Sequence, residues 1–265
     1  MNRLAKKLGF YASVFVLVSP AVLVFLWMIS LSLKNELDNT AFPPVFIPNP
    51  PTLANYLDVF EKNNFALYLW NSILVTGGAV LVGLAVGVPA GYGIARGKAH
   101  KFAILILVAR MTPALSYLIP LFLLFQMTGL VGTITALVIT HLVITIPIIV
   151  WIMIGYFENV PMELEDAARI DGATTWQAFR HVALPLARPG IVVGGILAFI
   201  FSVVLGGKAS RTLPSAVYNS LTFEQISWGP LAAAALLVTL PVLLLTVLAQ
   251  REIVAGLSAG GLKDG

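Results

Sequence analysis

The sequence predicts an all-α, polytopic membrane protein with six transmembrane helices, and three observations support this fold class. Hydrophobic residues make up 58% of its 265 residues. Charged residues make up only 11%, whereas ordinary globular proteins carry about 25%. The few charges gather in clusters between long apolar runs. So few charges cannot cover a water-exposed surface, and lipid must therefore solvate much of the protein.

Six apolar runs are each close to the roughly 20 residues that a helix needs to cross about 30 Å of hydrocarbon. The fifth run begins after Pro189 and fades at Gly206 and Gly207. The other five are expected at residues 9–33, 70–95, 102–126, 133–157 and 231–249.

Two clusters of positive charge fall on the same side of the membrane if these runs alternate in direction. By the positive-inside rule this side is cytoplasmic, and so are both termini. The segment from Lys34 to Leu69 then lies outside, and its prolines favour an extended chain. The first run is too long for a signal-peptide core, so we expect a retained anchor. The clusters are Arg3, Lys6 and Lys7 before the first run, and Arg96, Lys98 and Lys101 after the second.

Glycines recur every four residues in the second run, at Gly83, Gly87 and Gly91. On a helix they line one face and allow another backbone to approach closely. Tight helix packing is the simpler interpretation, and a role in gating or in lining a substrate path is the alternative.

No cofactor site is expected in this chain. It has no cysteine, which excludes a disulfide framework and a thiolate metal site. Gly97 and Lys98 do not form a nucleotide-binding loop, since Ala99 stands where that motif needs Ser or Thr. The net charge of +4 is small and scattered, which argues against nucleic acid as a partner.

The charged segment from Glu158 to Pro189 predicts two short helices and a turn. Pro161 suits a first helical turn, because its missing N–H would have no partner there. Gly172 is expected to end this first helix, because glycine adopts the left-handed conformation without penalty. Acidic residues crowd the positive end of the helix dipole, at Glu163, Glu165 and Asp166.

The second helix of this segment has its own start and stop signals. Thr174 and Gln177 match a capping box at its start, and Leu184-Pro185 is expected to end it. Trp176 and Phe179 lie three residues apart and would form one aromatic anchor. We expect this hairpin to dock a partner. The alternative is a solvated loop that rests its apolar face on its own bundle.

The same segment resembles the EAA loop of type I ATP-binding-cassette (ABC) importer permeases. The resemblance rests on the run from Glu165 to Ala173, then Phe179, Leu184-Pro185 and Pro189. In that family the loop is the coupling helix, which inserts into a groove on a separate ATPase subunit. Asp166 stands where a glutamate usually opens the motif, and Glu165 is a second candidate for that contact. The resemblance implies these ATPase-coupling residues: Glu163, Glu165, Asp166, Ala167, Ala168, Arg169, Asp171, Gly172, Trp176 and Phe179.

The resemblance covers nearly the whole chain and favours the carbohydrate branch, in particular the six-span maltose-type permease. It implies an N-terminal helix with an external loop (1–69), a permease core (70–250) with the EAA loop at 158–189, and a cytoplasmic tail (251–265). In that relative the tail reaches between the ATPase subunits. From the residues alone, a frayed glycine-rich terminus is the alternative. The implied C-terminal docking residues are Gln250, Arg251, Gly256 and Gly260.

The fifth run departs from the carbohydrate branch. These permeases usually carry a Trp-Asn pair and an aromatic residue beyond this helix, whereas here Ser202 is followed by Val203-Val204-Leu205 and two glycines. At about 1.5 Å per residue the helix from Gly190 to Leu205 is also too short to span the membrane. Residues are therefore expected to be missing, through a natural deletion, an engineered one or a gap closed up in the numbering.

Arg110 is the single charge inside a predicted span, where a charge should face water or the bundle interior. It could extend toward the cytoplasm, or the helix could break at Pro113. Arg110 and Tyr117 are the candidates for a substrate path, with a structural role for Arg110 as the alternative. His141 is expected to be a hydrogen-bonded core residue.

The resemblance implies a permease subunit of an ATP-driven importer for a sugar, oligosaccharide or polyol, in a bacterial or archaeal cytoplasmic membrane. It also implies a second permease, two ATPase subunits holding ATP and Mg²⁺, and an external solute-binding protein. This subunit would not be an enzyme. A permease for another solute (polyamine, phosphate or amino acid) is the nearer alternative. A membrane enzyme or secondary carrier is the other, although the spans lack the buried acidic residues that such carriers use.

Overall fold

A computed structural model describes residues 3–62, 64–204, 212, 217 and 226–261, and every element in these ranges is a helix. The chain divides into two compact units. The first comprises Met1–Leu67 and Ala216–Leu240, and the second comprises Tyr68–Ser215 and Pro241–Gly265. Four helices are long and apolar enough to cross a membrane, and two bent helix pairs raise the number to six if each pair is one span. The predicted all-α, multi-span fold class is confirmed.

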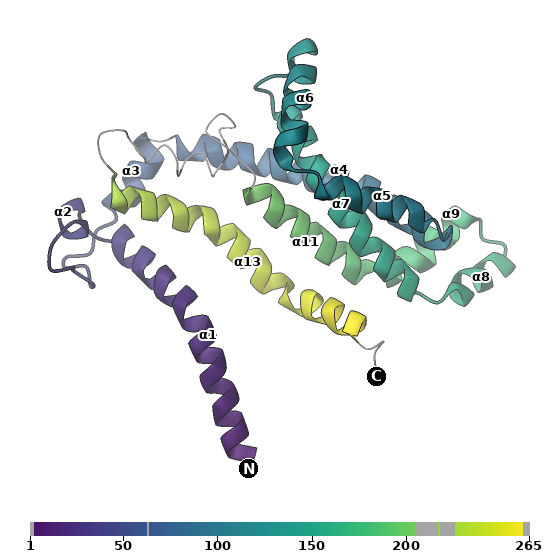
Figure 1. The fold of residues 1–265 in the computed structure, drawn as a ribbon, viewed down its shortest axis with the longest axis horizontal. Coiled ribbons are helices and arrows are strands. Elements are labelled where there is room, and N and C mark those ends of the chain that lie inside the picture. The colour runs from purple at the N-terminus through teal and green to yellow at the C-terminus, as the bar shows by residue number, and fades with distance from the viewer. Residues whose placement is uncertain (1–2, 63, 205–211, 213–216, 218–225, 262–265) are drawn as a thin grey trace. The chain divides into compact units, whose positions relative to one another are not determined.

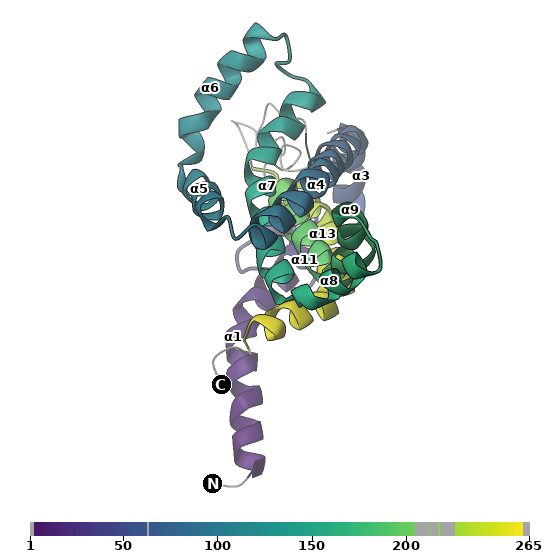
Figure 2. The same ribbon diagram turned by 90° about the vertical axis from the view of Figure 1, so that its right-hand side faces the viewer.

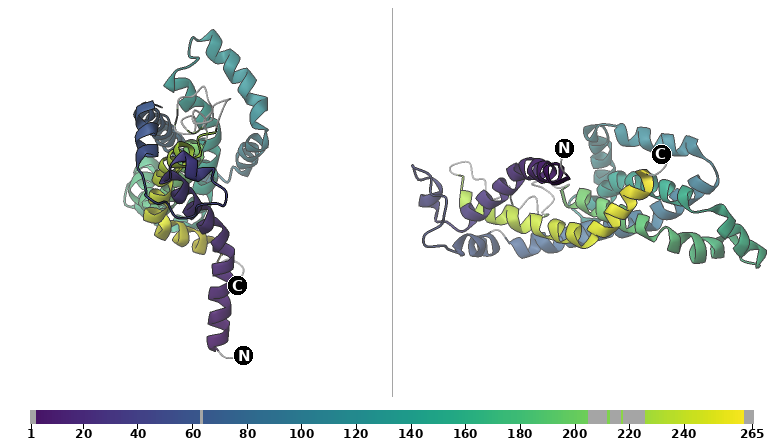
Figure 3. Two further views of the ribbon diagram at one scale, coloured as in Figure 1. Left: turned by 90° about the vertical axis from the view of Figure 1, so that its left-hand side faces the viewer. Right: turned by 90° about the horizontal axis from the view of Figure 1, so that it is seen from below.

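The first unit begins with the long helix α1 (Arg3–Ser32), which exposes most of its apolar side chains as a lipid-facing helix does. Two short helices follow it, α2 (Glu36–Asn39) and α3 (Ala54–Lys62). Residues 41–53 between them contain no helix, as their prolines predict. This extended segment is seen at the left of the right-hand view in Figure 3.

Polar side chains hold the segment after α1 in place. The side-chain amide of Asn55 donates to the carbonyl oxygens of Ser32, at 2.9 Å, and Lys34, at 2.8 Å. Lys34 is 1% exposed, and its ammonium group donates to the carbonyl oxygen of Val45 at 2.7 Å. Burial lowers the pKa of the Lys34 ammonium, and Asp38 offsets part of this shift. These bonds fix an irregular backbone that has no helix or sheet to satisfy it.

The Glu36 carboxylate caps the helix α13 (Trp228–Gly261). It accepts hydrogen bonds from the backbone N–H groups of Trp228, at 2.9 Å, and Gly229, at 3.1 Å. A carboxylate at a helix N-terminus satisfies free N–H donors and opposes the positive end of the helix dipole. The first half of α13 is thereby tied to the loop that follows α1.

The second unit is built on three helices that lie side by side in Figures 1 and 2, namely α4 (Phe65–Arg96), α7 (Ile134–Asn159) and α11 (Arg188–Val204). Their shared core includes Ile149, Met153 and Phe157 of α7, each of which is 0% exposed. This core lies at the end of the helices from which the candidate docking segment emerges.

Glycines allow α4 to approach α7 closely. A Cβ added at Gly87 would lie 2.7 Å from Ile149 Cγ2, and one at Gly91 would lie 2.6 Å from Met153 Cβ. Gly83 faces the same helix, at Thr145 and Ile149. The predicted role of these glycines in tight helix packing is confirmed.

The third predicted span is not one straight helix. It consists of α5 (His100–Met111) and α6 (Ala114–Met127), with a bend of 88° between them. The break falls at Thr112 and Pro113, because proline disfavours the helical conformation of the residue before it and has no N–H to continue the hydrogen-bond ladder. The break at Pro113 is thus the alternative that the structure bears out, and Figure 2 shows α6 standing away from α7.

The last two spans differ from expectation in their ends. The fifth helix, α11, begins at Arg188 and is described to Val204, so the predicted gap beyond it lies outside the described residues. The sixth helix, α13, continues past residue 249 to Gly261 without a break. A frayed terminus is therefore wrong up to Gly261, because helix formers such as Gln250, Arg251 and Glu252 extend the span. The division of the chain at residues 69 and 250 stays a prediction.

We expect Gly91→Ala to lower the free energy of unfolding by about 1–3 kcal/mol, because the new methyl group overpacks the contact with α7. The measurement is the Tm of the purified protein in detergent. Gly93→Ala is the matched control on the same helix, since no atom lies within 4 Å of its Cβ position. Equal Tm values for the two variants would contradict the close α4–α7 contact.

Candidate functional site

The segment between α7 and α11 forms a helical hairpin. Its first helix, α8 (Met162–Ile170), begins directly after Pro161. Gly172 has φ +92°, and its N–H donates to the carbonyl oxygen of Arg169 at 3.0 Å. The predicted glycine stop is confirmed, because this left-handed backbone conformation is one that residues with a Cβ rarely adopt.

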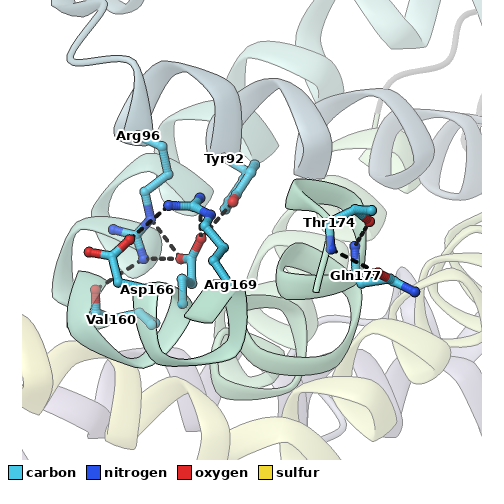
Figure 4. A network of polar contacts seen from close by, with 8 residues as sticks. Tyr92, Arg96, Val160, Asp166, Arg169, Thr174 and Gln177 are labelled. Carbon is cyan, nitrogen blue, oxygen red and sulfur yellow. Dashed lines mark hydrogen bonds and ion pairs between the residues drawn. The ribbon is translucent and has the colours of Figure 1, made fainter. Parts of the chain in front are cut away.

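The second helix, α9 (Thr175–Ala178), starts at the predicted capping box. The Thr174 hydroxyl accepts from the N–H of Gln177 at 3.3 Å, and the Gln177 side chain accepts from the N–H of Thr174 at 2.8 Å. Both bonds are drawn in Figure 4. The turn of the hairpin is therefore fixed by glycine on one side and by a reciprocal cap on the other.

Leu184-Pro185 does not end this helical stretch, which corrects the expectation from sequence. A π-helical turn at Phe179–Ala183 follows α9 directly, and the short helix α10 (Leu184–Leu186) follows that turn. In an α-helical turn the ring of Pro185 would clash with the carbonyl group four residues before it. The wider π turn at this point relieves that clash. The chain then bends by 73° into α11.

Glu165 lies inside the protein, unlike its acidic neighbours. It is 0% exposed, whereas Glu163, Asp166 and Asp171 are exposed. Its closest partners come from the end of α4: the Tyr92 hydroxyl donates to Glu165 Oε2 at 2.6 Å, and Arg96 Nε donates to Oε1 at 2.8 Å. Arg96 Nη2 also lies 2.6 Å from Oε1. Figure 4 shows Tyr92 and Arg96 pointing from α4 into this network.

Arg96 joins three helices at this point. Besides its ion pair with α8, its Nη2 donates to the carbonyl oxygen of Val160, at the C-cap of α7, at 3.1 Å. The Arg96 side chain is 14% exposed and Glu165 is fully buried. Removing one partner of a buried ion pair typically costs about 3–5 kcal/mol, because it leaves the other charge buried and unpaired.

A second, exposed ion pair lies beside the first. Arg169 Nη1 donates to Asp166 Oδ1 at 2.8 Å, and Arg169 Nη2 lies 3.6 Å from Glu165 Oε2. The Asp166 side chain is 54% exposed. An exposed pair one helical turn apart adds only about 0.3–0.5 kcal/mol to helix stability. Asp166 is therefore free to exchange Arg169 for a partner group at little cost.

Phe179 is not part of a surface anchor, contrary to the sequence-based expectation. It is 4% exposed, and its ring lies 4.6 Å from the Tyr92 ring and 6.1 Å from the Phe157 ring, centre to centre. Trp176 alone is exposed, at 61%. Phe179 is buried because α9 runs directly into the π turn, which presses its next side chains onto the bundle core.

The outward face of α8 is partly apolar although its inward face is charged. Residues at i, i+3 and i+4 share a helix face, and here the inward set is Glu165, Ala168 and Arg169. The outward set combines acidic and apolar side chains, including Ile170 at 87% exposure. A helix that only covers its own core turns its apolar side chains inward and its charged side chains outward, which is the reverse of what α8 does. The exposed residues of the hairpin, called the docking face below, are Met162, Glu163, Leu164, Asp166, Ala167, Ile170, Asp171 and Trp176.

The other predicted site residues lie apart from this hairpin or outside what can be described. Gln250 lies on α13 and is exposed, and the surroundings of Arg251, Gly256 and Gly260 lie outside the described part. Arg110 is exposed at the end of α5 and Tyr117 is half-buried on α6, so both remain predictions for a substrate path. Within the described ranges, no group of three or more His, Asp or Glu side chains could hold a metal ion.

The sequence did not single out Tyr92 or the role of Arg96. Arg96 was counted only as one charge of the positive cluster, and Tyr92 lies four residues before it on the same helix face. That spacing, opposite an acid-rich loop, is the signal that could have found them. His141 is buried as predicted, with Nδ1 2.5 Å from the hydroxyl oxygen of Ser202 on α11.

This fold, a bundle of helices able to span a membrane with a capped helical hairpin between two of them, is the one expected of a transport permease subunit. The chain belongs to the family described as binding-protein-dependent transport system inner membrane component, which matches residues 83–256.

Relatives of similar length support this membership. The chain is 34% identical over 272 aligned positions to the sulfoquinovosyl glycerol transport system permease protein SmoH of Agrobacterium fabrum, covering 97% of this chain and 94% of SmoH. It is 35% identical to the trehalose transport system permease protein SugB of Mycobacterium tuberculosis, covering 93% and 94%. The 272 positions outnumber the 265 residues of this chain, so the alignment with SmoH includes gaps in this chain.

Solved structures share the fold. A bacterial ABC transporter involved in the import of the acidic polysaccharide alginate matches with a TM-score of 0.74 at 21% identity, covering 95% of this chain and 98% of that one. The bacterial alginate ABC transporter in complex with an alginate pentasaccharide-bound periplasmic protein matches with a TM-score of 0.63 at 15% identity, covering 94% and 96%.

We expect Gly172→Ala to destabilise the hairpin by about 1–2 kcal/mol, because the new Cβ is strained in a left-handed backbone conformation. Limited trypsin digestion of the purified protein measures this effect through faster cleavage after Arg169 and Arg180, which flank the turn. Gly155→Ala on α7 is the control, since its Cβ would meet no atom within 4 Å. An unchanged cleavage rate in Gly172→Ala would show that the turn does not depend on this conformation.

Proposed function

We propose that this chain is the permease subunit of an ATP-driven sugar importer, and that its docking face binds a separate ATPase subunit. The observation that carries the proposal is the exposed, partly apolar face of a hairpin whose own geometry is fixed by a glycine stop and a capping box. An exposed Trp and Ile beside three carboxylates suit a groove that is apolar at its centre and basic at its rim.

The substrate class rests on the relatives. SmoH and SugB are permeases of transport systems for sulfoquinovosyl glycerol and for trehalose. Maltose/maltodextrin permease proteins MalG are further relatives, at 38% identity over 74% of this chain for the protein of Salmonella typhimurium. All three solutes carry sugar units, and we infer a sugar, oligosaccharide or polyol for this chain.

The remaining partners and the orientation belong to the same proposal. A second permease would complete the path, and a solute-binding protein would deliver the sugar, as the periplasmic protein in the alginate transporter complex suggests. The positive clusters favour cytoplasmic termini and a cytoplasmic hairpin in a bacterial or archaeal membrane. ATP and Mg²⁺ would be held by the two ATPase subunits.

The proposed partners imply a mechanism of transport. Closure of the ATPase dimer on ATP would displace the docking face, and the hairpin would transmit this movement to the bundle. The bundle would then alternate between inward- and outward-facing states around the sugar path. This subunit would form and break no covalent bond.

We expect Ile170→Asp and Trp176→Ala each to weaken binding of the ATPase subunit by about thirty-fold or more, as loss of an anchor side chain does. The measurement is co-purification of the ATPase with the tagged permease. Ile47→Asp is the matched control, because Ile47 is 80% exposed on the Pro-rich segment of the other unit. Retention of the ATPase by both hairpin variants at the native level would contradict the proposal.

We also expect liposomes that contain the complete transporter to accumulate a sugar when they are supplied with ATP and the cognate binding protein. Uptake is compared across labelled mono- and disaccharides, polyols, a polyamine, phosphate and an amino acid. ATP-dependent uptake of only a non-sugar solute would overturn the substrate class while leaving the permease assignment in place.

A further inference from the structure

Glu165 was expected to bind the ATPase, but its carboxylate is fully used inside the permease. Both oxygens have partners on α4: Tyr92 and Arg96 lie within 2.6–2.8 Å, and Arg169 lies 3.6 Å away on α8 itself. The carboxylate is 0% exposed. Since Asp166, the next residue, is exposed, two adjacent carboxylates of α8 face opposite surroundings.

The contact with α4 cannot open without a large penalty. A buried carboxylate that loses its counter-ion stays in a medium of low polarity, where an unpaired charge is strongly disfavoured. The Asp166–Arg169 pair is exposed, so it can break and re-form in water. The buried Glu165–Arg96 pair is therefore suited to holding α8 against α4. The exposed Asp166–Arg169 pair is suited to exchanging partners.

Aromatic and helix packing reinforce the same point. The Tyr92 ring packs edge-on to Phe157 of α7 at 5.2 Å and against Phe179 at 4.6 Å. Next to Tyr92, Gly91 lets α4 touch Met153 of α7 without a gap. The hydroxyl of Tyr92 thus reaches Glu165 from a ring that is itself fixed between α7 and the π turn.

We propose that Glu165, Arg96 and Tyr92 form a fixed joint, through which α8 and the cytoplasmic end of α4 move as one body during transport. Glu165 is then a positioning residue and not a contact of the ATPase. The joint rests on the proposed function, because it transmits to α4 the movement that the docking face receives. Loss of the joint leaves the ATPase bound but separates ATP hydrolysis from sugar uptake.

The absence of cysteine in this chain allows a direct test. In the complete transporter, the double variant Arg96→Cys/Glu165→Cys is compared before and after linking its two thiols with a short bifunctional reagent. Before linking, we expect sugar uptake per ATP hydrolysed to fall about five-fold or more, the lower range of typical coupling between sites. After linking, we expect uptake per ATP to return toward the native value.

Each other outcome overturns the joint. Native uptake per ATP before linking shows that the contact is not needed for coupling. A linked variant that loses its remaining uptake shows that α4 and α8 must separate during the cycle. A ratio that linking leaves low shows that tying the two helices together is not what the native side chains do.

A second variant covers failure of the double variant to accumulate in the membrane. Glu165→Gln keeps the shape of the side chain, removes its charge and replaces one acceptor oxygen with a donor amide group. We expect it to retain the ATPase and to lower uptake per ATP, whereas an unchanged ratio contradicts the proposal. Glu158→Gln is the matched control, because the Glu158 side chain is 42% exposed at the end of α7.

The failure of the joint and the failure of the proposed function are distinguishable in the same assay. Asp166→Lys reverses an exposed charge of the docking face and changes none of the three joint residues, Glu165, Arg96 and Tyr92. If both Asp166→Lys and Ile170→Asp retain the ATPase at the native level, the docking face itself is wrong. If Asp166→Lys loses the ATPase while Glu165→Gln keeps native coupling, only the joint is wrong.

Discussion

The buried charge of Glu165 is the constraint on which the rest of the hairpin depends. A carboxylate without solvent must keep its counter-ion, so α8 is held against the end of α4 by Arg96 and Tyr92. Arg96 also donates to the carbonyl oxygen of Val160, the C-cap residue of α7, so one guanidinium group fixes the point where α4, α7 and α8 meet. The outward face of α8 is then presented in one orientation, with its exposed acids and Ile170 available to a partner.

The cost of leaving a polar group unpaired also explains how the helices of the bundle pack. Within lipid every backbone group must be satisfied internally, so helices are packed through glycines and small residues and not through charged contacts. Gly87 and Gly91 bring α4 against α7, and this close approach places Tyr92 beside Phe157 and Phe179. The joint between hairpin and bundle is therefore a continuation of the helix packing, with the ion pair at the end of α4 that meets the hairpin.

Sequence reasoning found the parts that depend on local chemistry. The apolar runs, the glycine stop at Gly172, the capping box at Thr174 and the break at Pro113 each follow from a few neighbouring residues. It could not find contacts between residues far apart in the chain, such as Tyr92 and Glu165, 73 positions apart. The sequence also placed Glu165 and Phe179 among the docking residues with Asp166 and Trp176, because only the fold shows that Glu165 and Phe179 face inward.

The most direct test of this account is a structure of the complete transporter determined both with and without bound ATP. The account predicts that Ile170 and Trp176 are buried by the ATPase subunit and that the Arg96–Glu165 contact is intact in both states. A hairpin that stays exposed to solvent in the assembled transporter, or an Arg96–Glu165 pair that separates between the two states, would contradict it.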